Sequence, residues 1–254
     1  MKFISVLIVT LLLLIWFSHI QNFINRCDDL ETIILDSGIP GPCLGIIAGV
    51  HGNEPAASIA LTTLLKTNDT LIRPKRGKII IIPKANQCGL YENTRWHPLE
   101  NRKVFDFQQY DLNRKFNEYG GTNGKSEQII ETLQNCDLIL DFHEGWGWNV
   151  TTRNGWGPVS LGSSIFGTNH PLASLVAKRS VEEINKSIYD PNKKFVQLLN
   201  ESCTIPSTLG CYFEKTNKAS VVIETSGQND VQPLEVRMNQ IKKVIEVAKS
   251  ELMM

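Results

Sequence analysis

The sequence predicts an α/β fold, with a mostly parallel, mixed sheet and helices on both of its faces. Three observations lead to this prediction. Short apolar runs of strand length end at Gly, Pro or polar residues. Longer helix-forming stretches lie between these runs, and such alternation favours a parallel sheet between two helical layers. The chain of 254 residues is long enough for one substantial domain.

The expected strands and helices alternate along most of the chain. Strands are expected over residues 44–50, 78–82, 137–142 and 219–225. Helices are expected over residues 56–66, 126–135, 171–188 and 234–252. Pro55 suits the start of the first helix, and Ser126 can cap the second. Two long segments, 84–125 and 145–170, lack a clear period, and loops of this length in a compact domain are usually functional.

Residues 1–25 do not fit the globular pattern. An almost wholly apolar stretch from Phe3 to Phe17 follows Lys2, and bulky residues stand where a signal peptidase needs small ones. We therefore expect a membrane anchor before a catalytic domain over residues 26–254, with a cleaved signal peptide and secretion as the alternative. Lys2 precedes the stretch and acidic residues follow it, which predicts a lumenal or extracellular domain.

Charge and cysteine usage narrow the class of protein. The formal net charge is zero and no basic stripe is present, so no nucleic-acid partner is expected. None of the six cysteines forms a C-x-x-C pair, which argues against a cysteine zinc site. Spacing favours a disulfide between Cys203 and Cys211, with buried free thiols as the alternative.

Two motifs at expected strand ends carry side chains that can bind a metal. The HGNEP motif follows the first strand, and its His51 and Glu54 are close enough in a turn to share one ion. The DFHE motif ends another strand and adds His143, on the same face as the Asp of the motif. Two His and one Glu leave a zinc position open, as in catalytic sites. The alternatives are a turn that opens a helix near Glu54 and a solvated His143.

Two further segments offer groups for catalysis and binding. Glu224 lies near the end of a buried strand, where a carboxylate is costly unless it faces a cavity or a partner. It could serve as a general base, or form a structural salt bridge instead. In the DLNRKF segment, Arg114 can bind a carboxylate through two hydrogen bonds and Asn113 can add another. The alternative for this segment is an ordinary surface loop.

Together these segments resemble one family. HGNEP, DLNRKF, DFHEG and IETSG occur in the order and approximate spacing of the zinc carboxypeptidase superfamily. Within that superfamily, the residues of the HGNEP motif are most similar to the succinylglutamate desuccinylase/aspartoacylase group. The resemblance covers about residues 44–228 and implies a single carboxypeptidase-like domain that holds one Zn²⁺ per chain.

The resemblance also implies roles for individual residues. His51, Glu54 and His143 would bind the zinc, and Asp111 would orient a zinc-bound His, a role that metal sites generally require. Glu224 would be the general base. For the substrate, the resemblance assigns the free carboxylate to Asn113 and Arg114 and a further contact to Tyr212. An additional arginine would polarise the scissile carbonyl; Arg95 and Arg102 compete for this role, and Arg95 is preferred.

These inferences predict a zinc hydrolase of an amide bond in a peptide or N-acyl amino acid that bears a free carboxylate. Water on the zinc would be activated by Glu224 and attack the carbonyl. Two alternatives stay open: a deacylase or esterase that uses the same zinc centre on a non-peptide substrate, and a zinc-binding module without turnover.

Overall fold

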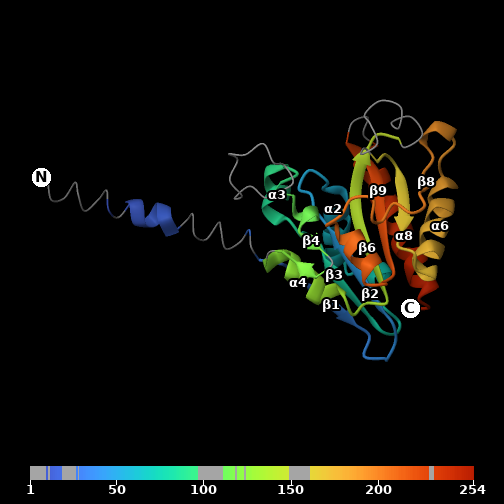
Figure 1. Cartoon of the computed structure of the whole chain (residues 1–254), viewed down its shortest axis with the longest axis horizontal. Helices are drawn as coiled ribbons and strands as arrows, with labels where there is room; N and C mark the ends of the chain where they lie inside the picture. The colour runs from blue at the N-terminus through green and yellow to red at the C-terminus, as the bar shows by residue number, and fades with distance from the viewer. Residues whose placement is uncertain are drawn as a thin grey trace, which may run out of the picture.

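The computed structural model describes residues 10, 12–18, 27, 29–96, 111–117, 119–122, 124–148, 161–228 and 232–254 (Figure 1). Within these ranges no helix combines the length and apolar character needed to cross a membrane. The segment 1–25, which we expect to be an anchor, lies mostly outside them, so this expectation stays a prediction.

A seven-stranded mixed sheet forms the centre of the molecule, in the order β1-β3-β2-β6-β9-β7-β8. Its four central strands, β3, β2, β6 and β9, are mutually parallel, whereas β1 and β7 join antiparallel to their central neighbours. The strands are β1 (Ile33–Asp36), β2 (Cys43–Ala48), β3 (Lys78–Ile82), β6 (Leu138–Trp146), β7 (Ser164–Gly167), β8 (Val196–Gln197) and β9 (Ser220–Gln228). A separate hairpin pairs β4 (Phe116–Asn117) with β5 (Gly120–Gly121).

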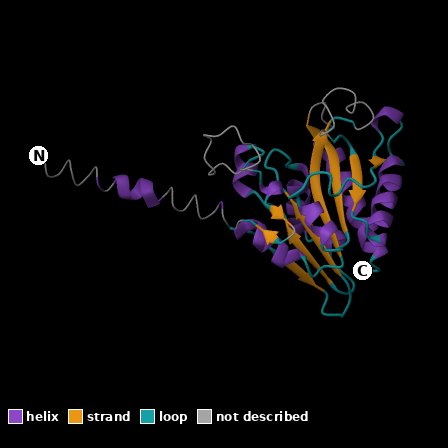
Figure 2. Ribbon diagram, viewed as in Figure 1, coloured by secondary structure: helices purple, strands orange, loops and turns teal. Residues whose placement is uncertain are grey.

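Helices cover both faces of this sheet, as Figure 2 shows. The α-helices are α2 (Ala56–Thr67), α3 (Gln87–Glu92), α4 (Gly124–Leu133), α6 (Pro171–Asn185), α7 (Leu209–Lys215) and α8 (Leu234–Glu251). Short 3-10 turns are η1 (Thr70–Ile72), η3 (Leu112–Arg114) and η4 (Pro191–Lys193). The predicted mostly parallel, mixed sheet between helical layers is therefore confirmed.

Alternation along the strands divides the core into two layers. On β3, Ile79 and Ile81 pack in the cluster that contains the buried faces of α2, α6 and α8. Ile80 and Ile82 pack in the opposite cluster, with residues of α4 and α7. Each central strand is thus buried on both faces, which explains its nearly continuous apolar sequence.

Several elements differ from the sequence-based prediction. The segment 145–170, expected as one long loop, contains β7, and the segment 84–125 contains α3, η3 and the β4–β5 hairpin. Ser126 does not cap α4, which begins earlier at Gly124; its hydroxyl instead accepts a hydrogen bond from Thr122 N. The helix α7 was not predicted, because its seven residues are too few for a clear period.

All six cysteines are paired. The predicted Cys203–Cys211 bond is present, with the Cα atoms 4.2 Å apart. Cys43–Cys136 links the starts of β2 and β6, and Cys27–Cys88 attaches the N-terminal part of the chain to α3. The alternative of buried free thiols is therefore wrong.

Candidate metal centre

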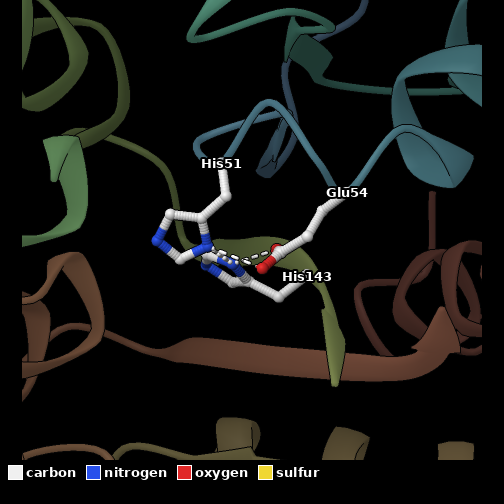
Figure 3. A group of neighbouring side chains, drawn as sticks. All are labelled: His51, Glu54 and His143. Atoms are coloured by element: carbon white, nitrogen blue, oxygen red, sulfur yellow. Dashed lines mark hydrogen bonds and ion pairs between the residues drawn. The ribbon is translucent and has the colours of Figure 1, made fainter. Parts of the chain in front are cut away.

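Three buried side chains converge where the turn after β2 meets the second half of β6 (Figure 3). The Nδ1 atoms of His51 and His143 lie 3.1 Å apart. Each is 2.8 Å from one carboxylate oxygen of Glu54, His51 from Oε1 and His143 from Oε2. Each of the three residues is only 3% exposed. Among the residues that the structure describes, this is the cluster of His, Cys, Asp and Glu that could hold a metal ion.

The turn after β2 brings His51 and Glu54 together. Glu54 N donates to His51 O at 3.3 Å, which folds the intervening residues back on themselves. A Cβ atom on Gly52 would lie 1.9 Å from the carbonyl carbon of Gly89, at the side of α3. Gly52 is therefore required by the close approach of α3.

Two further carboxylates fix the direction of the imidazoles. His51 Nε2 lies 3.1 Å from Asp111 Oδ1, and His143 Nε2 lies 3.2 Å from Asp141 Oδ1. Metal-binding histidines commonly place the second ring nitrogen on a carboxylate in this way, which turns the first toward the ion. Asp111 thus lies where it could orient the ring of His51, and Asp141 lies at a similar distance from the second histidine.

The electrostatics of the cluster favour a positive charge at its centre. Burial opposes ionisation of Glu54, yet the two imidazoles hold the pKa of its carboxyl well below the usual value. Burial likewise disfavours a charged His143, but Asp141 and Glu54 raise its pKa well above the ordinary value. Nitrogen and carboxylate donors in this number suit Zn²⁺. The residues present therefore fit a zinc ion held by His51, Glu54 and His143.

Glu224 lies next to the centre because of the sheet register. On the parallel neighbours β6 and β9, Glu224 is the direct partner of His143, so both side chains emerge on the same face. Burial raises the pKa of Glu224 to about 8, with Glu54 and Asp141 also raising it and His143 and Arg95 lowering it. The carboxylate lines the same cavity as the three metal-binding side chains.

Arg95 is the arginine that the structure places at the centre. Its Nε and Nη2 donate to Asp111 Oδ2 at 3.1 and 3.0 Å, and its Nη1 lies 3.5 Å from Glu54 Oε1. The competing candidate, Arg102, falls outside the described residues. Arg95 therefore lies beside the candidate metal ligand Glu54, and its role at the scissile carbonyl stays a prediction.

Asn113 and Arg114 line the cavity from η3. Asn113 Oδ1 accepts from Leu209 N at 2.9 Å, so the amide nitrogen of Asn113 is left to donate to a ligand. Arg114 Nη1 donates to the Asn113 carbonyl at 2.7 Å. Burial lowers the pKa of Arg114, but a guanidinium stays charged in proteins.

The cavity has a volume of about 630 Å³, enough for a small peptide or an acylated amino acid.

The position of Tyr212 gives no support to the predicted substrate contact, which stays a prediction. The residue lies on α7, half-buried against the core beneath that helix, with its ring 5.4 Å from that of Phe213. It is not among the residues that line the cavity. Because the sequence did not reveal α7, it could not show which way this side chain points.

Sequence reasoning missed two residues that contact the centre. Gln228, at the end of β9, donates from Nε2 to Glu54 Oε1 at 3.1 Å and to Glu144 O at 2.6 Å. Glu144, next to a metal ligand in the DFHE motif, donates its backbone N–H to Glu54 Oε2 at 3.1 Å. The only signal in the sequence was that Glu144 lies in the DFHE motif and Gln228 follows the IETSG motif. Neither position reveals these contacts.

The seven-stranded mixed sheet thus carries a His-Glu-His cluster that could hold a metal ion. Residues 40–147 match the family model described as the succinylglutamate desuccinylase/aspartoacylase catalytic domain. This stretch carries His51, Glu54 and His143, and the match confirms the resemblance predicted from the motifs. Glu224 lies beyond the matched residues. A search of curated proteins finds no match to the chain.

Solved structures confirm the fold. One is the mDAP-bound form of Csd4 from Helicobacter pylori, a D,L-carboxypeptidase, with a TM-score of 0.65 and 20% identity over 87% of this chain and 54% of that one. Another is an aspartoacylase family protein from Mesorhizobium loti, with a TM-score of 0.53 and 22% identity over 89% and 62% of the two chains. The chain thus spans about half the length of Csd4.

Proposed function

We propose that this chain is a zinc-dependent hydrolase that cleaves an amide bond in a peptide or N-acyl amino acid with a free carboxylate. The observation that carries the proposal is one cavity in which a His-Glu-His cluster, the Glu224 carboxylate and the Asn113–Arg114 pair all meet. The family match supports a hydrolase of the desuccinylase or aspartoacylase type, and the fold that the chain shares with Csd4 adds the carboxypeptidase type. Csd4 has been solved with mDAP and with a tripeptide, which supports a substrate that bears a carboxylate.

Glu224 is suited to move the proton in this reaction. Zinc held by His51, Glu54 and His143 would supply a Lewis acid that acidifies a water and polarises a carbonyl. A positive charge beside Glu224 would favour its ionised form and so lower the pKa that burial raises. Glu224 then accepts the proton of the attacking water and returns it to the departing amine.

Positively charged side chains orient the substrate. Arg114 and the amide nitrogen of Asn113 bind the free carboxylate, which fixes the distance between that group and the scissile bond. The Arg95 guanidinium is held by Asp111 and lies close to Glu54, where it stabilises negative charge as it develops on the carbonyl oxygen.

Arg114→Ala is expected to lower kcat/KM for a carboxylate substrate by roughly 10- to 100-fold, since a charge-assisted hydrogen bond contributes roughly 1.5–3 kcal/mol. The same substitution should have little effect on the substrate whose carboxylate is amidated, because that contact is already missing. Steady-state kinetics on an N-acyl amino acid and its amide measure the difference, in which general damage to the fold cancels.

A matched control is Arg179→Ala, which removes an exposed guanidinium on α6 that pairs with Glu251. It should leave both substrates unaffected. Equal losses on the two substrates with Arg114→Ala would show that Arg114 does not read the carboxylate. The proposal of an amide substrate with a free carboxylate would then give way to the alternative of a deacylase or esterase with a non-peptide substrate.

We also propose that the domain functions outside the cytoplasm, in the lumen or extracellular space. Three disulfides support this location, since such bonds persist in oxidising compartments. In intact vesicles the domain should resist a protease added on the cytoplasmic side. Digestion from that side would contradict the proposal, and recovery of a shortened soluble chain would identify residues 1–25 as a cleaved signal peptide.

A further inference from the structure

Glu144 points away from the metal ligand that precedes it. Residues alternate along β6, so His143 faces the α4 and α7 side, whereas Phe142 and Glu144 face the layer of α2, α6 and α8. Glu144 is only 2% exposed there. A buried carboxylate is costly unless charged or hydrogen-bonded partners compensate it, so its partners indicate what it does.

Both carboxylate oxygens of Glu144 have partners on neighbouring helices. Oε1 accepts from Ala56 N, the first residue of α2, at 2.6 Å. Oε2 forms a buried ion pair with Arg237 Nη1 on α8, and Arg237 Nε also donates to Gln232 O at 3.0 Å. A Cβ atom on Gly227 would lie 1.5 Å from Glu144 Oε2, so a larger residue at position 227 would displace the carboxylate.

The contact with Ala56 acts at the start of α2. The N-cap of this helix is Pro55, which provides no side-chain hydrogen bond. The orphan N–H groups of a first turn need acceptors, and Glu144 supplies one from a strand far away in sequence. Because Glu54 directly precedes Pro55, the cap holds the helix start next to this metal-binding side chain.

The main chain of Glu144 completes the support. Its N–H donates to Glu54 Oε2 at 3.1 Å, and its carbonyl accepts from Gln228 Nε2 at 2.6 Å. The same Gln228 nitrogen donates to Glu54 Oε1 at 3.1 Å. Glu54 is thus held directly by the backbone of Glu144, and through α2 by its carboxylate.

We infer that Glu144, paired with Arg237, is a positioning residue that caps α2 and thereby sets the orientation of Glu54 in the metal centre. Glu144 is not one of the three side chains that could hold the metal ion. The inference rests on the zinc centre of the proposed function. Residues that orient metal ligands are commonly worth about 10- to 100-fold in metal affinity.

The test is zinc affinity of the purified full chain, measured by competition with a chelator. Glu144→Ala is expected to weaken zinc binding by about 10- to 100-fold. Glu144→Gln keeps an oxygen that can accept from Ala56 N and should restore much of the affinity. Should the alanine variant not fold, Arg237→Met is expected to weaken binding in the same direction, because Glu144 loses the partner of its second oxygen. The absorption spectrum with Co²⁺ in place of zinc should change in parallel.

Thr168→Val is the matched control. Thr168 is buried and bridges two main-chain groups, Lys218 O and Ser220 N, through its hydroxyl, far along the sheet from the metal centre. It should lower stability without changing zinc affinity or the Co²⁺ spectrum. Variants at 144 and 237 that bind zinc like this control would overturn the inference, as would a glutamine variant as weak as alanine. If the unaltered chain itself binds no zinc, the proposed function is wrong as well. This outcome differs from the one in which the unaltered chain binds zinc and only the variants fail to weaken binding.

Discussion

Replacing His51 or His143 by alanine is expected to abolish both zinc binding and turnover. Each substitution removes one of three protein donors from a buried cluster, and the remaining two cannot hold the ion in a catalytic geometry. Metal analysis of the purified variants should find far less than one zinc per chain, and hydrolysis should fall to background.

His170→Ala provides the control for loss of an imidazole. His170 caps α6, where its Nδ1 accepts from Leu172 N at 3.3 Å, and it does not line the cavity. This variant should keep its zinc and its activity. Full zinc occupancy in His51→Ala or His143→Ala would show that the ligand assignment is wrong.

Glu224→Gln is expected to lower kcat by about 10²–10⁴-fold while leaving zinc content intact. The amide has nearly the same shape as the carboxylate but cannot accept a proton at neutral pH. Rates and metal content measured on the same preparation separate loss of the base from loss of the centre. Glu183→Gln, which neutralises an exposed carboxylate on α6, should be indistinguishable from the unaltered chain. A folded Glu224→Gln variant with near-normal turnover would refute the role.

The same variant reports on the Glu224 carboxyl in metal-free protein. Folding raises the pKa of Glu224 from 4.5 to about 8, so the protonated carboxyl stabilises the folded state fully below pH 4.5. This stabilisation is lost as the pH rises from 4.5 through about 8, because the unfolded chain ionises first. Metal-free protein should therefore lose stability relative to Glu224→Gln between these pH values. Denaturant unfolding at several pH values measures this, and a difference that does not change with pH would contradict the assigned burial effect.

The sequence alone predicted the parts of the site that depend on local patterns. His51 and His143 follow apolar runs of strand length, and parallel strands bring their carboxyl ends to one edge of the sheet. Alternation along the strand also predicted that Asp141 and His143 share a face. Such patterns act over a few residues, so they remain visible without knowledge of the tertiary structure.

Contacts that depend on packing between distant elements could not be predicted. Arg237 meets Glu144 across 93 residues, and Gln228 reaches Glu54 from the end of another strand. The four residues of β7 and the seven of α7 are too short to show a period. The sequence therefore could not show that Tyr212 lies on α7, half-buried beside Phe213.

The disulfide between Cys43 and Cys136 has a consequence for how the candidate metal centre would take up an ion. It joins the starting ends of β2 and β6; His51 follows the far end of β2, and His143 lies in the second half of β6. A slip of one residue would turn His143 to the opposite face, but this covalent link opposes sliding of the strands. With this disulfide formed, the domain should therefore keep His51 and His143 in their relative positions when no metal ion is bound. Reloading should be an encounter between a preformed receptor and a free cation, without a refolding step.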